Sequence, residues 1–222
     1  MTEKCDEKET TSMALPKYNP NAMKPEDIYD LSDVVSDDYL LCLLDEANEA
    51  LKNLLQKQSV PDLFPYITNF MKKFVEKTED HSRKRCMLVY LNYLIRFSSF
   101  IVNRKRVEVS QFEGSHIPEE LRYKLIERYT VAAKGRRLIS SMLRDSLISH
   151  IVLFMLFFSD FKISMNEFVK DAQIGEKRLK TIARLLGCKV TTEKGHGISS
   201  LTLKQPPSTK HVFTARGRKS FR

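Results

Sequence analysis

The stretch Asp145–Lys204 constrains the fold of this chain more than any other part of the sequence. It starts with an apolar segment of helical length and ends with two strand-like runs. Between them, Ser164 and Glu167 have the spacing of a capping box, and Gly187 has the position of a helix-terminating glycine. The expected elements, in order, are helix 145–159, short helix 165–172, turn 173–175, helix 176–186, and strands 188–192 and 198–203. This is the order of elements in a winged-helix domain.

The helix expected at 176–186 carries basic residues along one side, opposite an apolar stripe. In a helix-turn-helix, this is the element presented to a DNA groove. The candidate DNA-binding residues of this unit, including two on the hairpin, are Lys177, Arg178, Lys180, Arg184, Lys189 and Lys194. Two alternatives stay open: the basic residues are ordinary solvated side chains on an amphipathic helix, or the winged helix docks onto proteins.

Charge is distributed unevenly along the chain. Residues 1–60 hold 13 acidic and 6 basic residues, whereas residues 61–222 hold 15 acidic and 31 basic residues. The net charge is therefore −7 in the first part and +16 in the second, which sum to the +9 of the chain. A strongly basic body predicts a polyanionic partner, and the acidic part either links it to something else or masks it.

Cysteines and apolar runs indicate the compartment. Cys5, Cys42, Cys86 and Cys188 are widely spaced, with no Cys-x-x-Cys and no histidine pair, so we expect free thiols in a reducing compartment. The longest unbroken apolar run, 151–158, has eight residues, and the sequence predicts neither a membrane span nor a signal peptide. We expect an intracellular protein, and the basic tail 206–222 fits the nucleus.

The first part of the chain, residues 1–38, is expected to be an acidic linker that is extended or disordered. It is rich in charged residues and is interrupted by three prolines. Its isolated large apolar residues are candidate anchors to another surface: Leu15, Tyr18, Ile28, Tyr29 and Leu31. An amphipathic helix is predicted over Tyr39–Gln56, with an apolar face that packs either on its own domain or on a partner.

A second globular unit is predicted over 39–142. Its expected elements are a helix opened by Pro61, a long helix at 83–100, a helix at 118–128, and a hairpin formed by 129–133 and 136–140. Three helices and a hairpin are again the parts of a winged helix, although the connection 101–116 is long. The predicted fold is therefore mostly α with small β-hairpins: two winged-helix domains in tandem, 39–142 and 143–205, after an extended linker.

Further basic clusters lie in the first unit. Arg136 and Arg137 lie on its predicted hairpin, and Arg104, Lys105 and Arg106 lie in the loop after its long helix. Such residues favour phosphate contacts, which give salt-sensitive, sequence-independent affinity for double-stranded DNA. The helix at 176–186 has neither Asn nor Gln, so a base-reading code is not indicated.

No pattern in the sequence supports catalysis, a cofactor or a metal site. There is no phosphate-binding glycine loop, no nucleophile elbow and no His-x-x-His spacing. His150 lies on an apolar helix and is expected to be a hydrogen-bonded core histidine rather than a catalyst.

Several segments resemble the C-terminal part of the forty-nine-kilodalton subunit family of RNA polymerase I. The segments that carry the resemblance are Asn21–Tyr29, Tyr39–Leu44, Met87–Phe97 and Asp171–Arg178, within a similarity over about residues 15–205. The resemblance implies a linker and tandem winged helix that lies over the polymerase cleft. It also implies a non-catalytic subunit that binds DNA and supports initiation, promoter escape and elongation of ribosomal RNA synthesis in the nucleolus. RNA polymerase I core subunits and initiation factors are the implied partners.

One departure from that family is expected. Its members also have an N-terminal β-rich module that dimerises with a second polymerase subunit, and nothing in this sequence resembles it. A fragment, an isoform and a divergent member are all consistent with this. The alternative function is a winged-helix adaptor within a transcription complex that does not itself bind DNA significantly.

Overall fold

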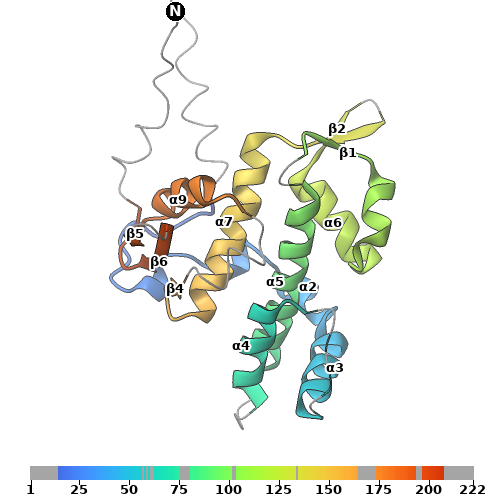
Figure 1. The fold of residues 1–222 in the computed structure, drawn as a ribbon, viewed down its shortest axis with the longest axis horizontal. Helices are drawn as coiled ribbons and strands as arrows, with labels where there is room; N and C mark the ends of the chain where they lie inside the picture. Colours follow the sequence, from blue (N-terminus) through green and yellow to red (C-terminus); the bar gives the residue numbers. More distant parts are fainter. Residues whose placement is uncertain are drawn as a thin grey trace, which may run out of the picture.

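The computed structural model describes residues 15–56, 58, 60, 63–75, 81–101, 104–133, 135–164, 174–193 and 197–207. Within these ranges the chain is mostly helical and has two small antiparallel sheets, each with three strands (Figure 1). The predicted mostly α class with small β elements is confirmed. Each predicted hairpin gains a third strand that the sequence analysis did not anticipate.

Two long helices form the centre of the core. α5 (Ser82–Ile101) and α7 (Ser141–Phe158) pack against each other, and they bury thirteen and ten residues respectively. α7 begins four residues before the predicted position, because the Ser140 hydroxyl accepts a hydrogen bond from the Leu143 amide and caps the helix. By length and composition alone α7 could cross a membrane, but 56% of it is buried in the core.

Three helices cover α5 on one side: α2 (Asp37–Leu41), α3 (Leu44–Leu55) and α4 (Pro65–Val75). The single helix predicted over 39–56 is thus two helices, because Leu43 leaves the helical conformation (φ −99°, ψ 4°). The predicted start at Pro61 is wrong. α4 begins at Pro65, where a proline is tolerated in the first turn, and the buried Asn92 side chain accepts a hydrogen bond from the Phe64 amide.

The two sheets share one topology. In the first sheet the strands are β1 (Arg106–Val107), β2 (Val131–Ala133) and β3 (Arg136–Leu138), in the order β1-β3-β2. In the second they are β4 (Lys162–Ser164), β5 (Cys188–Glu193) and β6 (Gly197–Leu203), in the order β4-β6-β5. In both sheets the last strand is central and pairs antiparallel with its two neighbours.

Together with the sheets, the helices form a structural repeat that occurs twice along the chain. α5, β1, α6 (Glu119–Tyr129) and the β2–β3 hairpin follow the same order as α7, β4, α9 (Glu176–Leu185) and the β5–β6 hairpin. The long connection in the first repeat contains the 3-10 helix η3 (Val109–Ser115). In the second repeat, Ser164 ends β4, and the short helix predicted after it, 165–172, lies outside the described residues.

Residues 15–36, called the leader below, pack on both repeats. The leader contains two 3-10 helices, η1 (Pro25–Asp27) and η2 (Leu31–Asp33). The Tyr29 hydroxyl donates a hydrogen bond of 3.0 Å to the Leu186 carbonyl after α9, and the Arg128 guanidinium of α6 donates to the Val34 carbonyl.

The predicted anchors of the leader are confirmed: Ile28 and Leu31 are buried, and Leu15, Tyr18 and Tyr29 pack against the core. Residues 15–36 therefore lie against the body of the molecule, and the linker over residues 1–38 stays a prediction. The proposed domain division near residue 143 stays a prediction, since one continuous apolar core runs through both repeats.

His150 of α7 lies in this core, as expected, and shares a hydrogen bond of 2.6 Å with the Tyr129 hydroxyl through its Nδ1. Burial lowers the pKa of His150 to about 3, helped by the charge of Arg128. The unfolded chain therefore takes up the proton first, and folding stability falls as the pH drops below the ordinary value of 6.5.

We expect wild type to lose about 2 kcal/mol of unfolding free energy between pH 7 and pH 5 that a His150→Gln variant does not lose. Glutamine can still bond to Tyr129 but does not titrate in this range. Urea unfolding of both proteins at pH 7, 6 and 5 measures the difference. Parallel pH profiles would show that the buried imidazole does not govern acid sensitivity.

Candidate nucleic-acid interface

The first group of basic side chains lies on α9 and on the strand that follows it. Leu179, Ile182 and Ala183 are buried, which fixes the helix against α7 and β5 and leaves its basic side outward. Lys177 and Arg184 are exposed and Lys180 is half-buried; Lys189 on β5 is also exposed. None of these four forms an ion pair with another described residue.

The second group lies on the first sheet and the loop before it. Arg104, Lys105 and Arg106 are exposed, and Arg106 on β1 is in register with Leu138 of β3. Arg136 of β3 lies on the same face of the sheet as Leu138, two residues along the strand. Its Nε is 3.6 Å from the Glu108 carboxylate, an ion pair between two side chains that are more than half exposed.

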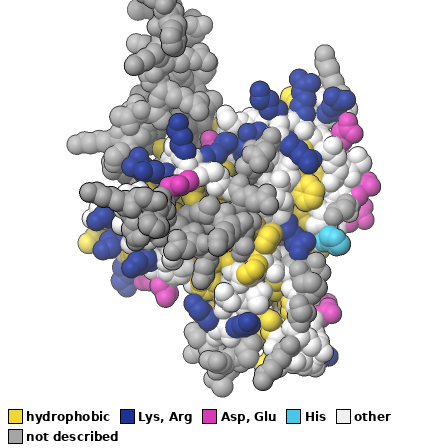
Figure 2. Space-filling model, viewed as in Figure 1, with side chains coloured by type: hydrophobic (Ala, Val, Ile, Leu, Met, Phe, Trp, Pro, Cys, Tyr) yellow, Lys and Arg dark blue, Asp and Glu magenta, His cyan; other side chains and the backbone are white. Residues whose placement is uncertain are grey.

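Figure 2 shows Lys and Arg side chains on the face of the molecule that carries α9 and the first sheet. Dark blue side chains gather at two places on its upper part, around α9 and above the end of the first sheet.

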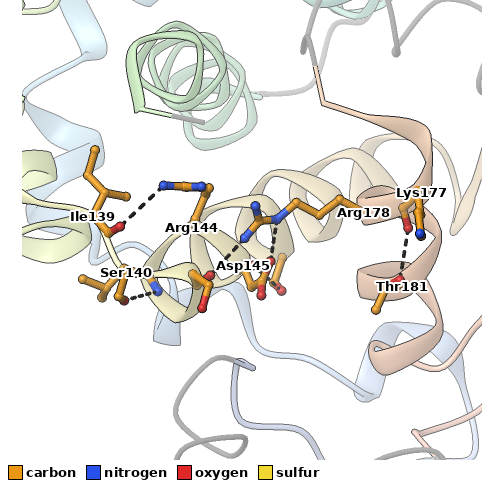
Figure 3. A network of polar contacts seen from close by, with 10 residues as sticks. Ile139, Ser140, Arg144, Asp145, Lys177, Arg178 and Thr181 are labelled. Atoms are coloured by element: carbon orange, nitrogen blue, oxygen red, sulfur yellow. Dashed lines mark hydrogen bonds and ion pairs between the residues drawn. The ribbon is translucent and has the colours of Figure 1, made fainter. Parts of the chain in front are cut away.

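The first turn of α7 connects the two groups (Figure 3). Arg178 of α9 donates from Nε to the Asp145 carboxylate at 2.7 Å and from Nη2 to the Ser141 carbonyl at 3.1 Å. Arg144, the residue before Asp145, donates to the Ile139 carbonyl at 3.4 Å and to the Arg104 carbonyl at 2.6 Å. These bonds fix α9 on one side of the turn and the start of the first sheet on the other.

Asp145 makes this arrangement of like charges tolerable. The pKa of Arg144 is lowered by burial and by the neighbouring charge of Arg178, and Asp145 opposes that effect. The Asp145 carboxylate thus lies close to two guanidinium groups, those of Arg144 and Arg178. Removing it would leave both cations close together and partly desolvated, which costs more than losing an exposed ion pair.

The eleven residues predicted to bind DNA therefore differ in their exposure and in their contacts. Arg178 is 29% exposed and holds α9 to α7. Arg137 faces the body, where it donates to the Thr130 hydroxyl at 2.8 Å and to the Ile126 carbonyl at the end of α6. Lys194 lies outside the described residues. The side chains whose charge is directed to solvent, or only weakly paired, are Lys177, Lys180, Arg184, Lys189, Arg104, Lys105, Arg106 and Arg136.

Sequence reasoning missed Arg144 and Asp145, which organise the interface without being its most exposed members. Arg144 lies just before the helix predicted over 145–159 and Asp145 begins it, and neither was among the candidate site residues. A signal was present, because an adjacent Arg and Asp at the start of a buried helix must find partners when that end is packed. The identity of those partners depends on tertiary structure.

The equivalent helices of the two repeats differ in charge. α6 has three acidic residues and three basic ones, for a sum of zero. α9 has one acidic residue and four basic ones, for a sum of +3. The repeats are therefore alike in topology but not in electrostatics, and only α9 has the charge expected of a helix facing a phosphate backbone.

The described part of the leader does not cover these basic groups through ion pairs. Glu26 lies 3.5 Å from Lys24 and Asp37 lies 2.8 Å from Arg83. Asp30 accepts a hydrogen bond from the Ser32 amide, which is the main reason its pKa is lowered. Among residues 15–36, no carboxylate is paired with Lys177, Arg184 or Arg106.

Comparison with known proteins gives a consistent result. A family model described as "A49-like RNA polymerase I associated factor" matches residues 1–215. The chain is 23% identical to DNA-directed RNA polymerase I subunit RPA49 of Homo sapiens, over 94% of this chain and 53% of that protein. The same subunit of Xenopus laevis is 28% identical, over 87% of this chain and 50% of that protein. The chain thus spans about half the length of these relatives.

A double-mutant cycle with Arg178→Gln and Asp145→Asn tests the connection through α7. We expect a coupling energy of about 1 kcal/mol, since the pair is well aligned but about a third exposed. Asp145→Asn should cost more than Arg178→Gln, because it leaves Arg144 and Arg178 uncompensated. Chemical unfolding of the four proteins gives these values. A coupling energy of zero would mean that the pair does not hold α9 to α7.

Proposed function

Because the chain belongs to the family of A49-like RNA polymerase I associated factors, we propose that it is a non-catalytic subunit that holds double-stranded DNA for RNA polymerase I. The observation that carries the DNA-holding role is the pair of exposed basic groups, connected by the Arg178–Asp145 and Arg144–Arg104 contacts. Affinity would come mainly from phosphate contacts and would be largely independent of sequence.

The proposed architecture is a tandem winged helix. It is supported by the shared order of elements in the two repeats and by the two three-stranded sheets, each with its last strand in the centre. In this proposal α9 is the groove-facing helix of the second unit and α6 is its counterpart in the first. The hairpins β2–β3 and β5–β6 are the wings, and residues 206–222 form a basic tail.

The charge difference between α6 and α9 supports an asymmetric role for the two units. The second unit presents its helix to DNA, while the first contributes through Arg104, Lys105, Arg106 and Arg136, beside its sheet. No amide side chain is present on α9, which favours backbone contact over base reading.

In the cell this activity would keep DNA near the polymerase during initiation, promoter escape and elongation of ribosomal RNA synthesis. The corresponding site is the nucleolus. RNA polymerase I core subunits and initiation factors would be its protein partners, and neither a cofactor nor a metal is needed for such a role.

A second function is favoured by one observation. Val131 and Leu138, a cross-strand pair on the outer face of the first sheet, are 54% and 36% exposed. An exposed apolar pair beside Arg106 and Arg136 also suits a protein partner. The alternative is therefore an adaptor whose winged helices dock onto proteins without holding DNA.

Reversing the charges of α9 tests the main proposal. In fluorescence anisotropy titrations with two unrelated duplexes, we expect Lys177→Glu/Lys180→Glu/Arg184→Glu to abolish most binding at moderate salt. The slope of log affinity against log salt should fall by about 2 to 3, at ~0.9 per lost phosphate contact.

The matched control makes the same change of charge elsewhere, with Lys17→Glu/Lys52→Glu/Lys72→Glu, which are exposed on the leader, α3 and α4. It should retain most of the affinity. Equal losses in both triple variants would mean that net charge alone drives binding. No binding by wild type even at low salt would favour the adaptor.

Reversing Lys105 and Arg106 tests whether the first repeat contributes. We expect Lys105→Glu/Arg106→Glu to weaken binding by about tenfold and to lower the salt slope by about 2. Its effect should add to that of the α9 reversal, because the two groups lie on different repeats. An unchanged affinity in the same titration would restrict DNA contact to the second unit.

A further inference from the structure

A hollow of about 640 Å³ lies where the leader crosses the body. Its apolar floor comes from α5, the end of α7, the turn after α7 and the last strand. The floor residues are Met87, Leu153, Leu156, Phe157, Phe161 and Leu203. None of the candidate DNA-binding residues lines it.

The leader forms the opposite wall of this hollow and is held there by its own contacts. The Asn19 amide donates to the Ile28 carbonyl at 2.8 Å, which closes the loop between them. The Asn19 side chain accepts from the Asn21 amide, and the Tyr29 hydroxyl fixes the end of the loop to the Leu186 carbonyl. The wall is thus formed before any partner arrives, which reduces the entropic cost of binding.

Three exposed carboxylates form an acidic rim on the leader side of the hollow. Glu26, Asp27 and Asp30 line it, with Arg83 as the one basic lining residue. Arg83 is paired with the Asp37 carboxylate at 2.8 Å, and Glu26 lies 3.5 Å from Lys24, so Asp27 and Asp30 are the rim carboxylates without a described ion pair. Hydrogen bonds from Ser32 lower the pKa of Asp30, whose carboxylate is in any case ionised at neutral pH.

Met23 extends the apolar lining to the outside. It belongs to the lining of the hollow, and its side chain is 92% exposed, the highest value among the exposed large hydrophobic residues described. Met23 thus places a large apolar side chain at the surface next to the apolar floor, where a partner could bury both together.

We propose that this hollow docks a segment of an RNA polymerase I subunit that inserts one large apolar side chain and flanks it with Lys or Arg. The acidic rim selects the basic flanks, and Met23 with the floor selects the apolar side chain. The inference rests on the proposed function, because it gives the polymerase-binding surface of a subunit that holds DNA on its basic residues.

The test uses RNA polymerase I prepared without its resident A49-like subunit, in the absence of DNA, and measures binding of the full chain by biolayer interferometry. We expect Glu26→Lys/Asp27→Lys and, separately, Met23→Ala to weaken binding by about tenfold or more. The control Glu49→Lys/Glu127→Lys makes the same charge change on exposed positions of α3 and α6, and should bind like wild type. Circular dichroism and melting curves confirm that each variant is folded.

Duplex DNA binding, measured in parallel, separates a failure of the docking inference from a failure of the proposed DNA-holding function. If rim variants bind the polymerase as wild type does, the docking inference is overturned and the DNA-holding function stands. If wild type binds DNA but not the polymerase, the docking inference is again overturned. If wild type binds neither, the proposed function itself fails.

A photoreactive benzophenone residue placed at Met23 identifies what occupies the hollow. Crosslinks to a polymerase segment with a large apolar residue between Lys or Arg residues would support the inference. Crosslinks to an acidic segment, or to another part of this same chain such as 208–222, would overturn it.

Discussion

The contact between α5 and α7 is the interaction on which the other parts of the structure depend. α7 is apolar on nearly every side because α5 and α6 pack on it from the first repeat, and α9 and β4 pack on it from the second. Because α7 is packed on two sides, it cannot rotate or shift without losing contacts with one repeat or the other. The position of its first turn is therefore fixed. Arg144 and Asp145 project from that turn, and through them the core determines where both basic groups lie.

A single carboxylate has a large effect at this position. Asp145 is 35% exposed and accepts from Arg178 while Arg144 lies beside it. The positive charges of Arg144 and Arg178, held close together, raise the local positive potential. This potential favours the binding of a polyanion, but the repulsion between the two charges lowers the stability of the free folded chain. Asp145 and the backbone carbonyls of Ile139 and Arg104 offset that cost.

Most of the helices could be predicted from the sequence, because long amphipathic or apolar stretches such as 83–100 signal their own structure. The strands β1 and β4 could not, since two or three residues carry no periodicity and exist only through pairing with β3 and β6. The leader was underestimated for a related reason: its few apolar residues, such as Ile28, are buried by distant elements. Of the candidate site, the exposed charges on α9 were predictable from spacing. The structural roles of Arg178 and Arg137 were not, because their partners lie 33 and 7 residues away in the chain.

Nonspecific phosphate contacts alone cannot orient a subunit, because a basic surface can slide along DNA and approach it in many registers. A subunit that works at one place on a polymerase therefore needs a second surface with different chemistry. The leader supplies carboxylates and an exposed methionine next to an apolar floor, while α9 and the first sheet supply cations. Since the leader is bonded to both repeats, through Tyr29 to Leu186 and through Arg128 to Val34, the two surfaces keep a fixed relation. Binding at the acidic surface would then determine which way the basic surface faces.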